Sequence, residues 1–129
     1  MADSFEVEKW LKKASEDYEF SASILADTTF YSQVCFFFQQ SAEKYLKAYI
    51  IKNDLGFKKI HDLIELLNIC KKQDNSFFEI FDHCKMLAAF YIDTRYPVYW
   101  PSLVSKEEAV DAQKSALKIK NFIESKIGK

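Results

Sequence analysis

Glycine and proline are scarce in this chain, which has only two of each among 129 residues. A β-sandwich or β-barrel needs many tight turns, and those turns depend heavily on these two residues. The sequence also lacks the alternating apolar and polar pattern that predicts strands, and it has no internal repeat or low-complexity tract. Long helices joined by short loops, packed as an antiparallel bundle, are the architecture that this composition favours.

A strong net charge is missing as well. The formal charge is −1, so no global field attracts nucleic acid or an anionic membrane, although a local basic patch is compatible with this balance. No apolar stretch is long enough to cross a bilayer, and the first residues lack the basic and apolar regions of a signal peptide. We therefore expect a cytoplasmic protein with no membrane partner.

Cysteine is present without the spacing of a metal site. Cys35, Cys70 and Cys84 are odd in number, lie far apart, and each stands in an apolar helical context. This pattern predicts buried, reduced thiols, which fits a reducing cytoplasm. We expect neither a bound metal nor a cofactor.

Apolar residues make up 49% of the chain and aromatic residues 16%. The length is that of one domain, so we treat residues 1–129 as a single helical domain with a large core, or with a core plus an apolar interface. The aromatic turn from Cys35 to Phe38 is either the deepest part of that core or a dimer seam, and the aromatic surplus favours the seam.

Helical periodicity and end signals predict five helices. Capping-box spacing, in which a glutamate follows a polar residue by three positions, marks starts at Asp3, Ser76 and Ser105. The predicted helices cover about 3–25, 30–53, 61–72, 76–91 and 105–126.

The fourth predicted helix leads toward Arg95. If it persists beyond Tyr91, Arg95 continues its inward face, because residues four apart lie on the same side of a helix. Pro97 and Pro101 would then end the helix, since the residue before a proline is biased toward extended backbone. The expected inward residues are Phe77, Phe81, Cys84, Ala88 and Tyr91 in this helix, and Ala109, Ala112, Ala116, Ile119 and Ile123 in the fifth.

The second helix carries the most specific motif, Gln39-Gln40-Ser41-Ala42-Glu43-Lys44-Tyr45-Leu46-Lys47. Trp10 and Asp17 precede it, and the runs Ile60-His61-Asp62-Leu63 and Thr94-Arg95-Tyr96-Pro97 follow it. This ordered set resembles the HEPN family, named for its occurrence in higher eukaryotes and prokaryotes, over nearly the whole chain. The resemblance implies an all-α, antiparallel up-and-down four-helix bundle with an additional short helix, assembled as a homodimer.

The resemblance also implies a choice of functions. Small prokaryotic members of the family are commonly encoded beside a minimal nucleotidyltransferase, and several such pairs behave as toxin and antitoxin. Active members cleave RNA without a metal, using an arginine and a later histidine that have four to six residues between them. Other members are thought to bind nucleotides or to serve as the helical partner of the nucleotidyltransferase.

The histidine of that RNA-cleaving pair is absent from this sequence. The expected positions after Arg95 hold Trp100, Pro101 and Ser102, and no histidine follows His83. Cleavage needs groups that take a proton from the 2′-hydroxyl and return one to the leaving oxygen, and arginine exchanges no protons usefully near pH 7. We therefore expect a non-catalytic module that binds a nucleotide or pairs with a nucleotidyltransferase.

The alternative is an RNase toxin that uses Arg95 with a proton carrier from elsewhere, for which His61 across the dimer is the candidate. Arg95 itself either contacts a ligand phosphate at the dimer cleft or pairs with Asp93 to fix the loop. Tyr96 either stacks on a base or packs beneath the proline-containing loop.

A polar face on the second helix is the other candidate binding surface. Its alternative is a solvated face in which Glu43 pairs with Lys47. His61 either caps or starts the third helix, or it takes a nucleotide-binding or catalytic role, and His83 is expected to be structural. The residues of the polar face are Gln39, Gln40, Glu43, Lys44 and Lys47.

Overall fold

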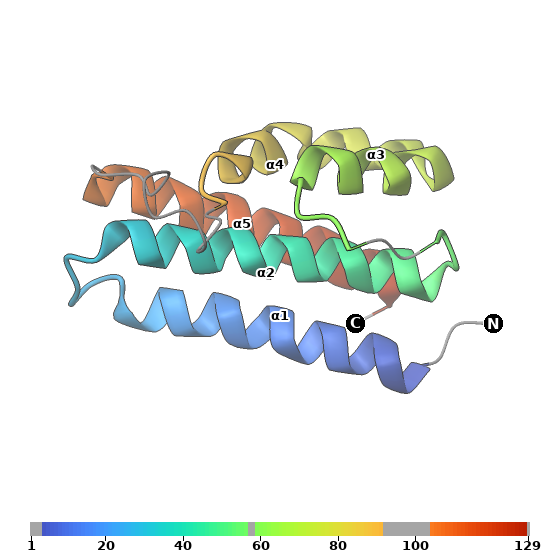
Figure 1. Ribbon diagram of the computed structural model, residues 1–129, viewed down its shortest axis with the longest axis horizontal. Coiled ribbons are helices and arrows are strands. Elements are labelled where there is room, and N and C mark those ends of the chain that lie inside the picture. Colours follow the sequence, from blue (N-terminus) through green and yellow to red (C-terminus); the bar gives the residue numbers. More distant parts are fainter. Residues whose placement is uncertain (1–3, 57–58, 92–103, 129) are drawn as a thin grey trace.

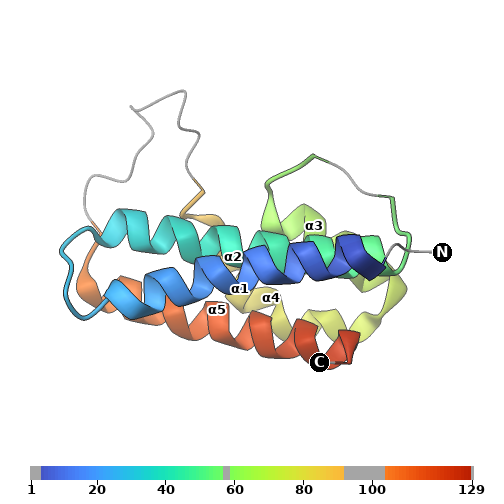
Figure 2. The ribbon, with the colours of Figure 1, turned by 90° about the horizontal axis from the view of Figure 1, so that it is seen from below.

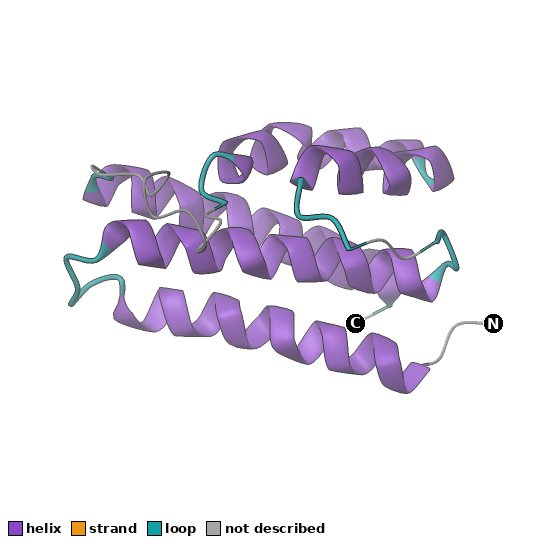
Figure 3. Ribbon diagram, in the orientation of Figure 1, coloured by secondary structure: helices purple, strands orange, loops and turns teal. Residues whose placement is uncertain are grey.

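Helices form all the regular structure in residues 4–56, 59–91 and 104–128, the part of the chain that the computed structural model describes (Figures 1 and 3). This confirms the expected all-α class. In chain order the elements are α1 (Ser4–Ile24), α2 (Tyr31–Lys52), α3 (Leu63–Gln73), the 3₁₀ helix η1 (Asn75–Ile80), α4 (Phe81–Ala88) and α5 (Lys106–Ile127).

Four of these helices, α1, α2, α4 and α5, alternate in direction and form the expected antiparallel up-and-down bundle (Figure 1). The additional short helix is α3, which runs in the same direction as α2 (Figure 1). Both α1 and α5 pack along α2, whereas α3 packs on α2 and α4 packs on α5, with α3 and α4 beside each other. The chain after α2 therefore returns to the middle of that helix before α3 begins.

The central helix, α2, is covered on most of its circumference, and 14 of its 22 residues are buried. Small residues allow α1 to approach closely: the Ser41 hydroxyl donates to the Ala14 carbonyl oxygen at 2.7 Å. Cys35 and Phe38 are both 0% exposed within a single chain. Their place is therefore the core, while the neighbouring Phe36 and Phe37 are partly exposed.

The ends of α2 and α3 have identifiable causes. Asp54 adopts a left-handed conformation (φ 51°) after α2, and the Leu55 amide bonds back to the Ile50 carbonyl oxygen at 3.0 Å, which forms a Schellman-type stop. At the start of α3, Asp62 is the N-cap residue, because its side chain accepts from the Ile64 amide at 2.9 Å. The expectation that His61 caps α3 is thus wrong by one residue.

The fourth predicted helix differs from the structure in its start, its inward face and its end. Asp74, and not Ser76, caps the segment, which begins as the 3₁₀ helix η1. Of the predicted inward residues, Phe77 and Cys84 are buried and Phe81 and Ala88 are partly buried against the core, but Tyr91 is exposed. The 3₁₀ turn, with three residues per turn, shifts the most buried positions by one residue. The residues buried in this region are Phe77, Ile80, Cys84, Leu87 and Phe90.

The α4 helix also ends at Ala88, well before Pro97. The amides of Phe90 and Tyr91 bond to carbonyl oxygens three residues back, at 2.9 and 3.4 Å, which tightens the last turn. The predicted continuation of an α-helical face to Arg95 is therefore interrupted before Tyr91.

The predictions for α5 and for the cysteines are confirmed. Ser105 and Glu108 form a complete capping box. All three thiols are buried and free of disulfide bonds, and burial raises their pKa values, that of Cys84 to about 12. None of the helices in the described residues has the length and apolar character needed to span a bilayer. The inward residues of α5 are, as predicted, Ala109, Ala112, Ala116, Ile119 and Ile123.

An ion pair between Asp74 and Lys126 ties the start of η1 to the end of α5, with 2.8 Å between Nζ and Oδ2. The hydrogen bond from Lys126, followed by those from the Ser76 side chain and backbone, lowers the pKa of Asp74 from 3.8 to about 2. A lowered carboxyl pKa means that this stabilisation is complete above about pH 3.8 and is lost as the pH falls through about 2.

The substitution Lys126→Met should therefore raise the pKa of Asp74 toward 3.8 and flatten the pH dependence of the unfolding free energy between these two values. Carbon-detected NMR titration of the Asp74 carboxyl measures the pKa directly. Lys118→Met, an exposed position on the same helix, is the matched control and should leave it unchanged. An Asp74 pKa that is the same in Lys126→Met and in the wild type would contradict this assignment.

Candidate functional site: a buried polar network on α2

Three of the five polar residues of this face of α2 do not face solvent. Gln39 is 0% exposed, Glu43 3% and Lys47 4%. The Glu43–Lys47 ion pair forms, with 2.9 Å between Oε2 and Nζ, but it forms inside the protein. The expectation of a solvated face is therefore wrong, because Trp10 of α1 and the segment that leads into α3 cover these side chains.

Glu43 is the centre of this network. Its Oε2 atom lies 2.9 Å from Lys47 Nζ and 3.0 Å from His61 Nδ1. Its Oε1 atom accepts longer bonds, each 3.4 Å, from the side-chain amides of Gln39 and Gln40. A buried carboxylate is costly unless it is paired and hydrogen-bonded, and both oxygens of Glu43 meet that condition.

The two glutamines connect the network to the backbone before α3. Gln40 donates to Gln39 Oε1 at 2.8 Å, and Gln39 in turn donates to the backbone oxygen of His61 at 3.3 Å. Every buried side-chain nitrogen or oxygen in the described residues has a hydrogen-bond partner. The network therefore fixes the position of His61 both through its ring and through its main chain.

His61 is the network's contact with solvent, since half of its side chain is exposed. An ionised carboxylate only accepts hydrogen bonds, so Nδ1 of His61 carries the proton that faces Glu43. That leaves Nε2 on the other edge of the ring to act as an acceptor when the ring is neutral and as a donor when it is protonated. The result is an imidazole of fixed orientation at the surface.

Tyr91 packs on the His61 ring, with 5.0 Å between centroids and 13° between planes. Figure 2 shows that the α2–α3 connection and the described residues just after α4 lie on the same side of α2. Tyr91 was expected to point into the core, and it is instead 37% exposed. Sequence reasoning missed this stacking because it depends on where α4 ends.

The predicted site residues are only partly brought together. Gln40, Glu43, Lys47 and His61 share the network described above. Lys44 does not, because it turns toward α1 and forms an ion pair with Asp17. Asp93, Arg95 and Tyr96 lie outside the described residues. Arg95, the only arginine in the sequence, follows Tyr91 by four positions.

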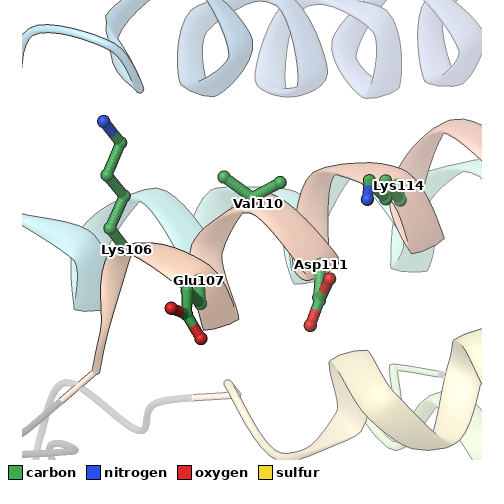
Figure 4. A pocket seen from close by; sticks show the side chains of 5 residues that line it. All are labelled: Lys106, Glu107, Val110, Asp111 and Lys114. Carbon is green, nitrogen blue, oxygen red and sulfur yellow. The ribbon is translucent and has the colours of Figure 1, made fainter.

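A metal site, His83 and a pocket on α5 are other candidates, and none is as well supported as the network. The described residues contain no group of three or more His, Cys, Asp or Glu side chains placed to hold a metal ion. His83 bonds to the Ser115 hydroxyl at 3.1 Å between α4 and α5, which fits the expected structural role. A surface pocket on α5 has both signs of charge and draws on one helix only (Figure 4), its lining being Lys106, Glu107, Val110, Asp111 and Lys114.

A double-mutant cycle tests the buried pair at the centre of the network. Glu43→Gln alone should lower the unfolding free energy by about 3 kcal/mol, because it leaves the Lys47 ammonium buried without its countercharge. Adding Lys47→Met should recover part of that loss, with a coupling of about 1 kcal/mol or more in urea denaturation. The more exposed Glu124–Lys120 pair on α5 is the matched control, with an expected coupling of about 0.5 kcal/mol or less. A coupling near zero for Glu43 and Lys47 would contradict this description.

Comparison with known proteins agrees with this architecture. A crystal structure of TT1696 from Thermus thermophilus superposes with a TM-score of 0.80 at 27% identity, covering 93% of this chain and 97% of that one. The structure of ST0689, an archaeal HEPN homologue, gives 0.73 at 23% identity over 94% and 97%. No curated protein matches the sequence. The family model of the HEPN domain matches residues 7–126, and the chain therefore belongs to the HEPN domain family.

Proposed function

We propose that this protein is a non-catalytic HEPN module that binds the phosphate of a nucleotide through His61 and Arg95. We further propose that it forms a homodimer and pairs with a minimal nucleotidyltransferase, as small members of the family commonly do. Under this proposal residues 1–129 act as one domain, and any toxin–antitoxin behaviour belongs to the pair of proteins.

The observation that carries the proposal is the environment of His61. Its ring is held by a buried carboxylate on one edge and by Tyr91 on one face, while half of the side chain is exposed. When the ring is protonated, its Nε2 donates to a phosphate oxygen. A donor fixed before the ligand arrives loses little conformational entropy on binding, which is how preorganised sites gain affinity. Arg95 follows Tyr91 by four residues, and a guanidinium is well suited to bidentate phosphate binding.

Nucleotide binding is favoured over RNA cleavage because the described network offers only one group per chain, His61, that can exchange a proton with a ligand. Glu43 is 3% exposed and is engaged by Lys47 and His61, so it is not available to a substrate. Nδ1 of His61 is engaged by Glu43, which leaves Nε2 for a substrate. Metal-free RNA cleavage needs both a base and an acid, and one imidazole edge supplies one of them at a time.

The second candidate function is an RNase whose active site contains one His61 from each copy of a homodimer. One observation favours it: the His61–Glu43 contact of 3.0 Å resembles the carboxylate–histidine pairs that orient an imidazole for proton transfer. Two such rings in one cleft, with the two Arg95 side chains, would supply the base and the acid together.

Calorimetric titration with AMP and ATP tests the proposal. Arg95→Ala and His61→Asn should each weaken binding about tenfold or more, because each removes a charged or polar phosphate contact. The asparagine side chain retains a donor toward Glu43 while it removes Nε2, so the network stays intact. His83→Asn, at the other histidine, is the matched control and should bind as the wild type does.

Incubation of the same preparations with RNA and a chelator separates the two candidates. We expect no cleavage. Light scattering should report a dimer, and that dimer should bind a minimal nucleotidyltransferase. Metal-independent cleavage that is lost in both Arg95→Ala and His61→Asn would overturn the proposal in favour of the RNase. The absence of both nucleotide binding and a partner would contradict it as well.

A further inference from the structure

A second polar and aromatic site lies on the other side of the network, where α1 meets α2. Three residues of α1, Lys9, Trp10 and Lys13, and Lys44 of α2 line a surface pocket of about 340 Å³. The lining surface is mainly apolar, although three of the four lining residues are lysines. This concentration of positive charge stands out in a chain whose net charge is only −1.

Two of the lysines at the rim are held only loosely by other groups. Lys13 lies 3.7 Å from Glu16, but both side chains are mostly exposed, and such pairs contribute little. Lys9 lies 4.9 Å from the centroid of the Phe5 ring, which is itself 68% exposed. Both ammonium groups can therefore turn toward an anion in the pocket at small cost.

The rest of the pocket is held firmly. Lys44 is anchored by Asp17, and the Trp10 ring packs against the hydrophobic core. Beneath that ring lies the buried Lys47, with 5.8 Å between Nζ and the ring centroid. Because Lys47 is paired with Glu43, the position of Trp10 depends on the same network that holds His61.

We propose that this pocket binds a nucleotide, with the base against Trp10 and the phosphate between Lys9 and Lys13. The Trp10 ring offers a planar aromatic surface for a base, and stacking of a base on an aromatic side chain tolerates any of the four bases. Lysine ammonium groups bind phosphate as point charges. The volume of about 340 Å³ lies within the range of small-ligand sites.

This site uses none of the residues assigned to the His61 site, so the two can fail independently. The phosphate and base come either from a free nucleotide or from the end of an RNA strand. Both sources present a base and a phosphate to the pocket. Separate titrations with AMP and with a short 5′-phosphorylated RNA distinguish them.

Tryptophan fluorescence gives a direct readout. The chain has two tryptophans, so in a Trp100→Phe background the signal comes from Trp10 alone. AMP or the 5′-phosphorylated RNA should quench it with a Kd below about 1 mM, and the tighter ligand identifies the source. Adenosine and inorganic phosphate, which each supply one half of the ligand, should bind about tenfold more weakly or worse.

Variants assign the effect to the pocket. Lys9→Ala with Lys13→Ala should weaken the quenching by about tenfold or more. Lys71→Ala with Lys72→Ala removes the same charge from a comparable surface pocket on α3 and should have no effect. Arg95→Ala with His61→Asn should also leave the quenching in place, which separates this site from the one proposed above.

Three results would overturn the inference. One is the absence of quenching by AMP and by the RNA while Arg95-dependent binding persists. Another is equal quenching by polyglutamate, which would make the lysines a docking surface for an acidic protein. The third is an equal loss of quenching in the α1 and α3 lysine variants, which would show that binding depends on the net charge of the protein and not on this pocket.

Discussion

The carboxylate of Glu43 is the group on which the arrangement of this protein depends. It is 3% exposed, and an ionised group so buried must find a countercharge and hydrogen bonds within the protein. Lys47 supplies the charge, and His61 and two glutamines supply the contacts. Because these groups come from α2 and from the segment before α3, satisfying one carboxylate also fixes where that segment crosses α2. Tyr91, after α4, then stacks on the fixed imidazole.

The parts of the fold that local chemistry determines were predictable from the sequence. The Ser105 capping box and the buried alanine and isoleucine stripe of α5 follow from spacing alone, and both are confirmed. The start and face of the fourth helix were not, because Asp74 competes with Ser76 for the cap and the 3₁₀ turn shifts the buried face. Both residue types are good helix caps, so local spacing does not rank them, and in the structure Asp74 also pairs with Lys126 of α5.

The candidate site shows the same division. Residues at positions 40, 43 and 47 were identified by helical spacing and by family resemblance, yet the sequence indicated a surface and the structure has a buried network. A polar run on one face looks the same whether solvent or another segment covers it. Only the return of the chain to the middle of α2 distinguishes the two cases. No histidine follows Arg95 in this sequence, and this burial turns His61 into an oriented group on which Tyr91 stacks.

The tautomer of His61 is the most direct test of this account. Nitrogen-15 NMR of the ring at a pH where the imidazole is neutral distinguishes a protonated Nδ1 from a protonated Nε2, and His83 provides a second ring in the same spectrum. If Glu43 orients the imidazole, His61 will show a protonated Nδ1 and a bare Nε2, and Glu43→Gln will weaken that preference. A His61 ring with Nε2 protonated, or a mixture that is unchanged by Glu43→Gln, would contradict the central role of the carboxylate.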